Sequence, residues 1–525
     1  MPVNNFAPAA GRREWIGLTI LTLATIVITF EMFVLLFALP LITADLRPNA
    51  VQQLWILDSY GFMVGGLLIT MGTLGDRIGR RKLLMIGAAC FAAACLVSAF
   101  ATDATTLIAG RALLGIAGST LAPSTLALIR NMFREPNQRG LAIGVWAASF
   151  PLGAILGSVV GGVVLAHFWW GSAFLLAVPV MVLLLVLCPL TIDEYRNPDG
   201  GAIDIVSALL SVGAMVAVSY GLKEITRHGA QATPILVGLC GIGCGVAFVR
   251  RQRRRDKPFM DLRLFENRSF STMLVGLVLY ALIGTSSMFY LIQYLQSVLG
   301  LTPFAAALCL LPGMVVATIS GIVAPLIGRR IRPAYLISGG IVGVAVAFAL
   351  FTQLDAESSP MLVIIGFAIM GLGEGPLLAV GTNLVISSAA PEQAGSAASL
   401  TQVANEAGAA LGVAVMGSIG AAVYRDRIVG AVPAGLEVPD AARDNLAAAL
   451  AADLPADLSA LLAAAARESF TAGMNVVAAI CVVILLVAAV IIAAVLRRVP
   501  TGDRGSEPAV PGTVGQSTPS SSGTT

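Results

Sequence analysis

Five charged side chains lie inside long apolar stretches of this sequence, where a charge is costly and usually marks a functional pathway. They are Glu31, Asp58, Arg111, Glu374 and Glu406. A carboxyl group held away from water can bind a proton and release it when a cation arrives. Competition between a proton and a cation for one carboxylate is the simplest device that could exchange the two. Arg111 could stabilise the charged form of a nearby carboxylate in one conformation.

A structural role is the alternative for each of these residues. An acid could simply pair with Arg111, or it could be wetted near the membrane surface, to which Asp58 lies nearest. Arg111 could be a purely structural cation. The pattern therefore predicts candidates for proton coupling without separating them from buried ion pairs.

Aromatic side chains and methionines could complete a pocket for a lipophilic cation. An aromatic face attracts a cation, and methionine adapts to several ligand shapes. Each residue taken alone is more readily explained by packing or by contact with lipid. The candidates are Met32, Phe33, Trp55, Trp146, Phe150, Tyr280, Met288 and Tyr290.

The elements that must position these residues are membrane-spanning helices. Of the 525 residues, 57% are hydrophobic and only 12% are charged, with a mean hydropathy of +0.88. A soluble protein would have about a quarter of its residues charged. Apolar runs of about twenty residues predict fourteen spans. They are 15–39, 53–74, 83–101, 105–128, 140–165, 170–191, 202–222, 233–250, 270–291, 303–327, 334–352, 361–387, 397–421 and 472–496.

The distribution of basic residues predicts the orientation of these spans. With the N-terminus in the cytoplasm, 24 of the 32 Lys and Arg residues fall in cytoplasmic segments, and Arg111 is the only one inside a span. Because positive residues are retained on the cytoplasmic side, we expect both termini there. The most basic loop, 251–269, is explained by topology and anionic lipid, so nucleic acid is not an expected partner.

A short basic loop joins the second and third predicted spans. Its glycines allow a tight turn, and its one acid could cap a neighbouring helix or pair with an arginine. The residues that define it are Gly72, Asp76, Arg77, Gly79, Arg80 and Arg81. This order of residue types resembles the signature loop of the major facilitator superfamily. The resemblance implies that the loop acts as a conformational gate.

An internal repeat divides the chain. Residues 321–330 repeat 72–81 with an offset of 249 residues, and Pro325 replaces Asp76. We expect an all-α integral membrane protein with two pseudo-symmetric six-helix bundles and two linking helices, an arrangement typical of transporters. The predicted parts are a cytoplasmic N-terminus (1–14), the first bundle (15–191), the linking helices (202–250), the basic loop (251–269), the second bundle (270–496) with an extracytoplasmic hairpin (424–470), and a disordered tail (497–525).

The fifth predicted span carries glycines that would let another helix approach closely. They are Gly144, Gly153, Gly157, Gly161 and Gly162. Ordinary packing of small residues explains part of this pattern, but the whole resembles the antiporter motif of proton-coupled exporters in the same superfamily. Ser158 stands where that motif has proline, so the kink of that proline is not expected here, although the glycines could still allow the helix to bend.

Taken together, these features resemble the fourteen-helix drug:proton antiporter branch of the superfamily, which includes quaternary-ammonium and multidrug efflux pumps. That branch usually has an aspartate about seven residues before Ala-Leu-Pro in its first span; here the acid is Glu31, before Ala38-Leu39-Pro40. Asp58 and Glu406 match positions where the branch often has acids. The tenth span has no acid, which argues against cargo that needs two widely separated carboxylates.

The resemblance implies proton-driven efflux of lipophilic, mainly cationic drugs by alternating access in the bacterial inner membrane. We expect a monomer with no metal and no cofactor beyond the proton gradient. Export of a native metabolite, lipid or siderophore, uptake by proton symport, and a receptor with a transporter-like body remain alternatives. An enzyme is not expected, because the sequence has no nucleophile elbow, phosphate loop or zinc-protease motif.

Overall fold

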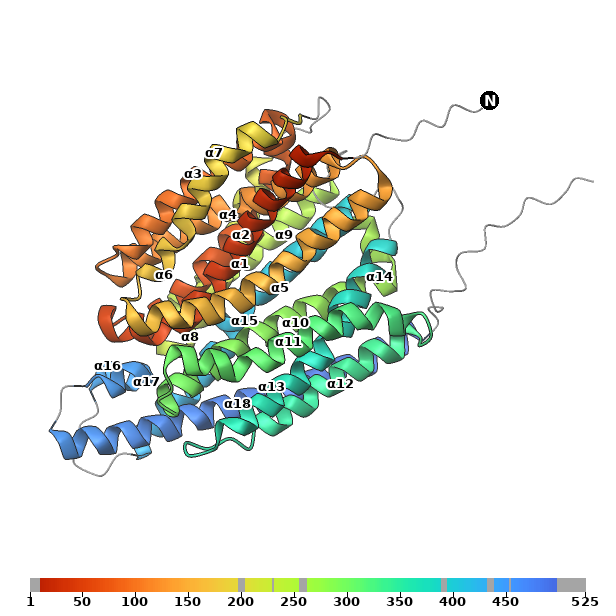
Figure 1. Cartoon of the computed structure of the whole chain (residues 1–525). Coiled ribbons are helices and arrows are strands. Elements are labelled where there is room, and N and C mark those ends of the chain that lie inside the picture. The colour runs from red at the N-terminus through yellow and green to blue at the C-terminus, as the bar shows by residue number, and fades with distance from the viewer. Residues whose placement is uncertain are drawn as a thin grey trace, which may run out of the picture.

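The computed structural model describes residues 10–196, 204–228, 231–254, 262–388, 394–431, 439–452 and 455–497, and every regular element among them is helical (Figure 1). The elements are α1 (Arg12–Leu46), α2 (Ala50–Ile78), α3 (Arg80–Ala99), α4 (Ala104–Met132), α5 (Pro136–His167), α6 (Ser172–Leu175), α7 (Ala177–Thr191), α8 (Ile205–His228), α9 (Ala232–Arg253), η1 (Leu262–Glu266), α10 (Arg268–Gln293), η2 (Tyr294–Val298), α11 (Pro303–Gly328), α12 (Pro333–Phe351), α13 (Pro360–Gly375), η3 (Pro376–Gly381), α14 (Thr382–Ser387), α15 (Ala394–Ala431), α16 (Asp440–Asp444), α17 (Leu446–Leu450) and α18 (Ala456–Leu496).

Within these ranges, 12 helices are long and apolar enough to cross a membrane, or 13 if α2 counts as one bent span. The bend separates Val51–Leu68 from Thr70–Ile78 by 54°. In α8 the apolar stretch Ile205–Gly221 ends where the side chains of residues 222 and 223 lie outside the described residues, so this helix is not among those counted. The prediction of an all-helical membrane protein is confirmed, whereas the count of fourteen spans stays a prediction.

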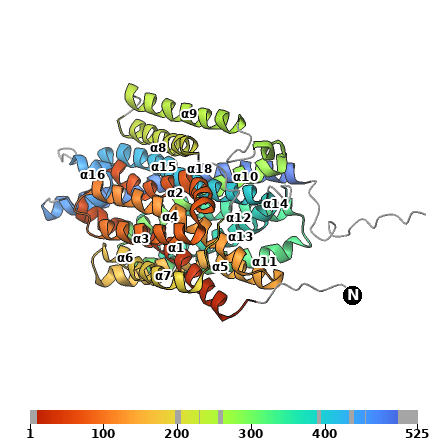
Figure 2. The ribbon, with the colours of Figure 1, turned by 90° about the horizontal axis from the view of Figure 1, so that it is seen from above.

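The long helices pack in two groups with a helix pair at the side. Helices α1–α7 form the first group, and α10–α18 form the second (Figure 1). The two groups meet where α2 packs on α15 and where α5 packs on α11. Helix α8 lies against both α2 and α15, and α9 lies on its far side (Figure 2). The pair α8–α9 therefore covers one seam between the groups.

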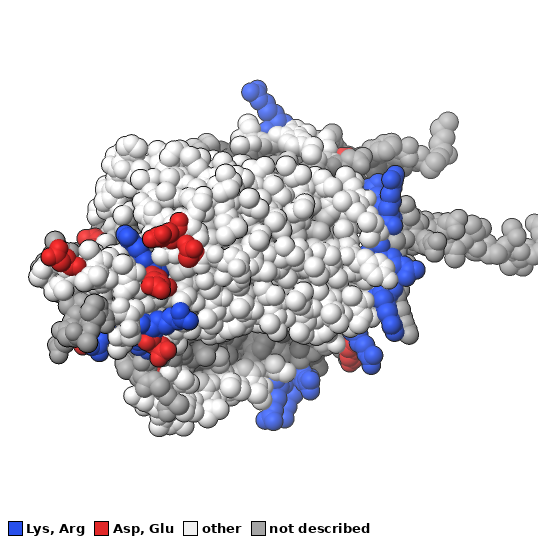
Figure 3. Space-filling view, turned by 90° about the horizontal axis from the view of Figure 1, so that it is seen from below, with Lys and Arg blue, Asp and Glu red and all other residues white. Residues whose placement is uncertain are grey.

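The two ends of the molecule differ in charge. Lys and Arg side chains gather at the end opposite α16 and α17, as Figure 3 shows. We call this the basic end, which carries the α2–α3 and α11–α12 turns, and we call the other the hairpin end. The repeated segments occupy equivalent places, because α2 ends just before Gly79 and α11 ends at Gly328.

The predicted hairpin, 424–470, is described except at residues 432–438 and 453–454, and it stays a prediction. Its flanks continue the neighbouring long helices, so that α15 runs to Ala431 and α18 begins at Ala456. The alanine-rich sequence favours this extension. Between them, Tyr424 Oη donates a hydrogen bond to Ala442 O (2.9 Å), and Asn445 Nδ2 donates to Pro48 O (3.3 Å) in the first group. Residues 1–9 and 498–525, and residues 255–261 of the basic loop, lie outside the described residues.

Candidate functional site

A buried ion pair joins α1 to α4 in the first helix group. Arg111 Nη1 donates to Glu31 Oε1, and the two side chains are 2% and 0% exposed. Arg111 Nε also donates to Ile56 O of α2 (3.1 Å), and its guanidinium carbon lies 4.8 Å from the centre of the Tyr60 ring. Arg111 is therefore bound by three helices, through a charge, a carbonyl dipole and an aromatic face.

Glycines bring these helices close enough for the pair to form. A Cβ atom on Gly115 would lie 2.4 Å from Tyr60 O, so only glycine allows α4 this near to α2. A Cβ on Gly157 would lie 2.6 Å from Phe30 O, beside Glu31. The small residues of α4 and α5 thus fix the depth at which the Glu31–Arg111 pair is buried.

Asp58 and Arg111 line one small cavity at the boundary of the two groups. Asp58 is 2% exposed, and Met32 also faces this cavity from α1. The opposite wall comes from the second group, through Thr285 of α10 and Val413 of α15. A change in how the groups meet would therefore alter the surroundings of both charged side chains.

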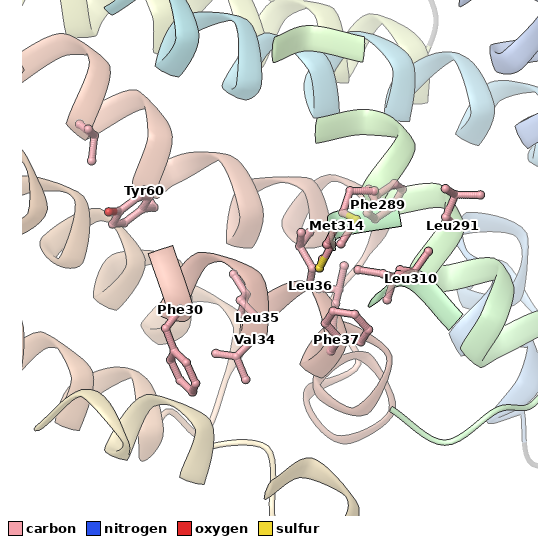
Figure 4. Packing of buried hydrophobic residues seen from close by; sticks show 14 of the residues in the cluster. Phe30, Val34, Leu35, Leu36, Phe37, Tyr60, Phe289, Leu291, Leu310 and Met314 are labelled. Atoms are coloured by element: carbon pink, nitrogen blue, oxygen red, sulfur yellow. The ribbon is translucent and has the colours of Figure 1, made fainter. Parts of the chain in front are cut away.

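An apolar layer separates this cavity from the hairpin end. Leu36 and Phe37 of α1 lie beside Leu310 and Met314 of α11, with Phe289 of α10 above them (Figure 4). Other contacts between the groups lie toward the same end. Gln296 Nε2 donates to Phe37 O (3.2 Å), and a Cβ on Gly162 would lie 2.9 Å from Phe304 Cα. The groups are thus closed against each other on the hairpin side of Glu31.

Glu374 is partly buried and lies at a different cavity, which is lined by residues of the second group alone. The walls come from α10, α12, α13, η3 and α18, and the Glu374 carboxylate and the Tyr280 ring both lie beside Gly284 of α10, at 3.9 and 4.0 Å from a Cβ built there. The structure therefore separates Glu374 from the Glu31–Arg111 pair. Glu406 lies in α15, one turn before the wall of the first cavity, but its side chain is outside the described residues.

The predicted pocket residues do not come together in one place. Met32 lines the cavity of Asp58, whereas Tyr280 lines that of Glu374. The other six are engaged in packing or in local contacts. These are Phe33 against Gly157, Trp55 edge-on to Phe62, Trp146 with Phe150 and the Thr125 hydroxyl, Met288 at 5% exposure, and Tyr290 bonded to Met416 O.

The loop between α2 and α3 is held by an internal pair and by a residue that sequence reasoning missed. Asp76 Oδ1 accepts from Arg80 Nε (2.8 Å) and Nη2 (2.7 Å). The helix cap comes instead from Glu194, whose carboxylate accepts from the backbone N–H groups of Arg81 (2.9 Å) and Lys82 (3.0 Å). Glu194 is more than a hundred residues away, so no local pattern could reveal it.

Gly79 is required at the turn between α2 and α3. Its φ is +112°, and a Cβ there would lie 2.6 Å from the Glu194 carboxylate. A Cβ on Gly72, by contrast, would meet only Arg80 and Pro123, each at 4.0 Å. The Arg77 side chain is exposed. The turn therefore depends on Gly79 for its backbone and on Arg80 and Arg81 for its contacts.

The glycines of α5 divide into a packed set and one free position. Gly153, Gly157 and Gly161 lie against α1, and Gly162 lies against α11, whereas nothing lies within 4 Å of a Cβ on Gly144. Ser158 Oγ donates to Ala154 O (2.9 Å), and the helix contains a proline at position 151. A proline removes one backbone donor, so the weak point of α5 is at Pro151.

Asp103 begins the helix that carries Arg111. Its carboxylate caps α4 by accepting from Thr106 N (2.9 Å) and from the Thr106 hydroxyl (2.6 Å). Hydrogen bonds from this hydroxyl and from the backbone favour the charged form, so they lower the pKa of Asp103 below its usual value. The negative charge of the Asp103 cap also interacts favourably with the positive end of the helix dipole.

Comparison with known proteins decides the family. The sequence profile of the Major Facilitator Superfamily matches residues 21–413. The chain belongs to the major facilitator superfamily. It is 41% identical to the multidrug efflux pump LfrA of Mycolicibacterium smegmatis, over 89% of this chain and 93% of the relative. It is 31% identical to the methyl viologen resistance protein SmvA of Salmonella typhimurium, over 87% and 93%.

Solved structures of transporters share the fold. A bacterial homolog of the human lysosomal transporter Spinster, in an inward-facing and unoccupied conformation, aligns with a TM-score of 0.62 at 16% identity, over 93% of this chain and 99% of that one. The fold is thus that of a facilitator-superfamily transporter, and the chain is a multi-pass membrane protein. Its relatives are drug-resistance transporters rather than enzymes, in keeping with the prediction of efflux.

Proposed function

We propose that this transporter exports lipophilic, mainly cationic drugs from the bacterial cytoplasm in exchange for protons. The proposal includes fourteen spans with both termini in the cytoplasm, which makes the basic end cytoplasmic. The collection of Lys and Arg at that end supports this orientation. The functional unit is a monomer, and the proton gradient is the only energy source.

The observation that carries the proposal is the buried pair of Glu31 and Arg111 beside Asp58. An ionised carboxylate in a low-dielectric site attracts either a proton or a cation. A cationic drug that entered the cavity between Asp58 and Thr285 would therefore take the place of a proton bound there.

Alternating access follows from where the groups touch. Closure by Leu36, Phe37 and Met314 on the hairpin side supports a conformation that is sealed toward the exterior. Cargo would bind from the cytoplasm and release a proton there. The groups would then tilt, opening this apolar layer, and an external proton would displace the cargo. Asp76 and Arg80 would latch the cytoplasmic side in the outward-facing state, while the α5 glycines allow helices to slide.

Transport by purified protein in liposomes tests this function. Vesicles would be preloaded with ethidium or methyl viologen, and an imposed pH gradient of either sign would drive flux. We expect cargo to move against its own gradient only when protons move the opposite way, and a protonophore to abolish that movement. Movement that ignores the pH gradient and the voltage would overturn proton antiport. Glu31→Gln and Asp58→Asn should lose coupled transport, while Asp193→Asn, at an exposed pair, serves as the control.

A further inference from the structure

The second cavity holds a carboxyl group that the proposed cargo site does not use. Glu374 is the last-but-one residue of α13 and faces a space bounded by four helices of the second group. Apart from Glu374 and Tyr280, every side chain on the described wall is apolar, and α12 and α18 contribute only residues such as Val344, Leu485 and Ile492. The cavity is therefore built around one acid and one phenol.

This environment differs from that of Glu31 in one decisive respect. Glu31 has the guanidinium of Arg111 as its counter-ion. No Lys, Arg or His lies on the described wall of the Glu374 cavity. A charge on Glu374 must therefore be balanced by something that comes from outside the protein, because an uncompensated charge among apolar groups is costly.

The size and position of the cavity favour a proton over a drug. The space lies inside one helix group rather than between the two, so the relative tilt of the groups does not open it to alternate sides for a large cargo. A proton needs no such opening. Tyr280 lines the same cavity, and a phenol can donate a hydrogen bond to an ionised carboxylate or accept one from the O–H of a neutral acid, so it suits both states of Glu374.

The backbone next to Glu374 is adapted to change shape. Directly after the residue that follows Glu374, the chain enters the π-helical turn η3, which begins with Pro376. A π turn and a proline both interrupt the regular α-helical hydrogen bonds, and π turns occur frequently at functional sites. Gly373 and Gly375 on either side pack tightly on α12 and α11, so a shift of those helices would move the carboxyl group directly.

We propose that Glu374, assisted by Tyr280, is a second proton-binding site, separate from the cargo cavity and loaded once per transport cycle. This inference rests on the proposed antiport. In the cycle, a proton from water binds a carboxylate oxygen of Glu374 in one conformation and returns to water in the other. The protein would therefore move one proton more per cargo than the site of Glu31 and Asp58 can carry alone.

The decisive experiment is the proton:cargo ratio of the full chain in liposomes, taken from the pH gradient that just halts a known gradient of methyl viologen. We expect Glu374→Gln to lower the ratio by about one proton while it still transports, and Glu374→Asp to restore it. Glu357→Gln, at an exposed loop position of the same helix group, is the control. An unchanged, non-zero ratio in Glu374→Gln overturns this inference and leaves the antiport standing. A ratio of zero in the wild-type protein removes the antiport itself.

If Glu374→Gln folds but does not transport, infrared spectroscopy of the purified protein still tests the inference. Infrared difference spectra of the purified protein between acid and alkaline pH report the C=O band of protonated carboxyl groups. We expect Glu374→Gln to lose one pH-dependent component and Tyr280→Phe to shift it. If the spectra of Glu374→Gln and the wild-type protein are the same, Glu374 does not exchange a proton and the inference fails. If Glu374→Gln does not fold, the infrared difference spectra of Tyr280→Phe and Glu374→Asp are compared with those of the wild-type protein instead.

Discussion

The Glu31–Arg111 pair makes the most exacting prediction, because it can be tested by a double-mutant cycle. The two side chains are 0% and 2% exposed, so removing either partner leaves an uncompensated buried group. From buried pairs in general, Glu31→Gln should cost about 3–5 kcal/mol of unfolding free energy. Arg111→Gln should cost a similar amount for the lost ion pair. It also removes the hydrogen bond to Ile56 O and the cation–π contact with the Tyr60 ring, which together should cost about 2–4 kcal/mol more.

The double variant removes both charges at once and leaves no lone charge behind. It should therefore be more stable than the sum of the single variants predicts, by about 3 kcal/mol, within the range of close charge pairs. Unfolding in mixed micelles, followed by tryptophan fluorescence, gives the four free energies. The pair Arg13–Asp193, whose side chains are 52% and 83% exposed, is the control and should show a coupling below about 1 kcal/mol. Additivity of the Glu31 and Arg111 variants to within about 0.5 kcal/mol would refute the buried pair.

Three further predictions concern positions that hold the site in place. Gly157→Ala should destabilise the protein by about 1–3 kcal/mol and slow efflux, because its Cβ would lie 2.6 Å from Phe30 O. The control is Gly144→Ala, which has open space around it and should leave the unfolding midpoint and efflux within error of the wild type. Equal effects of the two substitutions would contradict the close packing of α5 on α1. Gly79→Ala should cost about 1–3 kcal/mol through its φ of +112° and the nearby carboxylate; a chain with unchanged thermal stability and transport would argue against this turn. The lowered pKa of Asp103 means that the ionised cap stabilises the fold at neutral pH and that this contribution disappears as the pH falls through the lowered value. Thermal unfolding of Asp103→Asn, whose amide also caps but does not ionise, should thus differ from the wild type more at pH 7 than near pH 3, and a constant difference would be the contrary result.

Much of the site could be found without coordinates. A charge inside an apolar run is rare enough that Glu31, Asp58, Arg111 and Glu374 stand out from the sequence alone. The positions of most spans follow from hydropathy, because a helix in lipid must satisfy its own backbone and cover itself with apolar side chains.

The sequence by itself determined the membrane class, the basic end and which carboxyl groups lie inside apolar runs, since these depend on composition and local order. Only the tertiary structure decided which charges meet. It placed Arg111 on Glu31, 80 positions apart, it put Glu374 at another cavity, and it brought Glu194 to the N-terminus of α3 as a cap. Such pairings depend on how helices pack across the whole bundle, through glycine contacts and side-chain lengths, and nothing in a local pattern records which helix lies next to which.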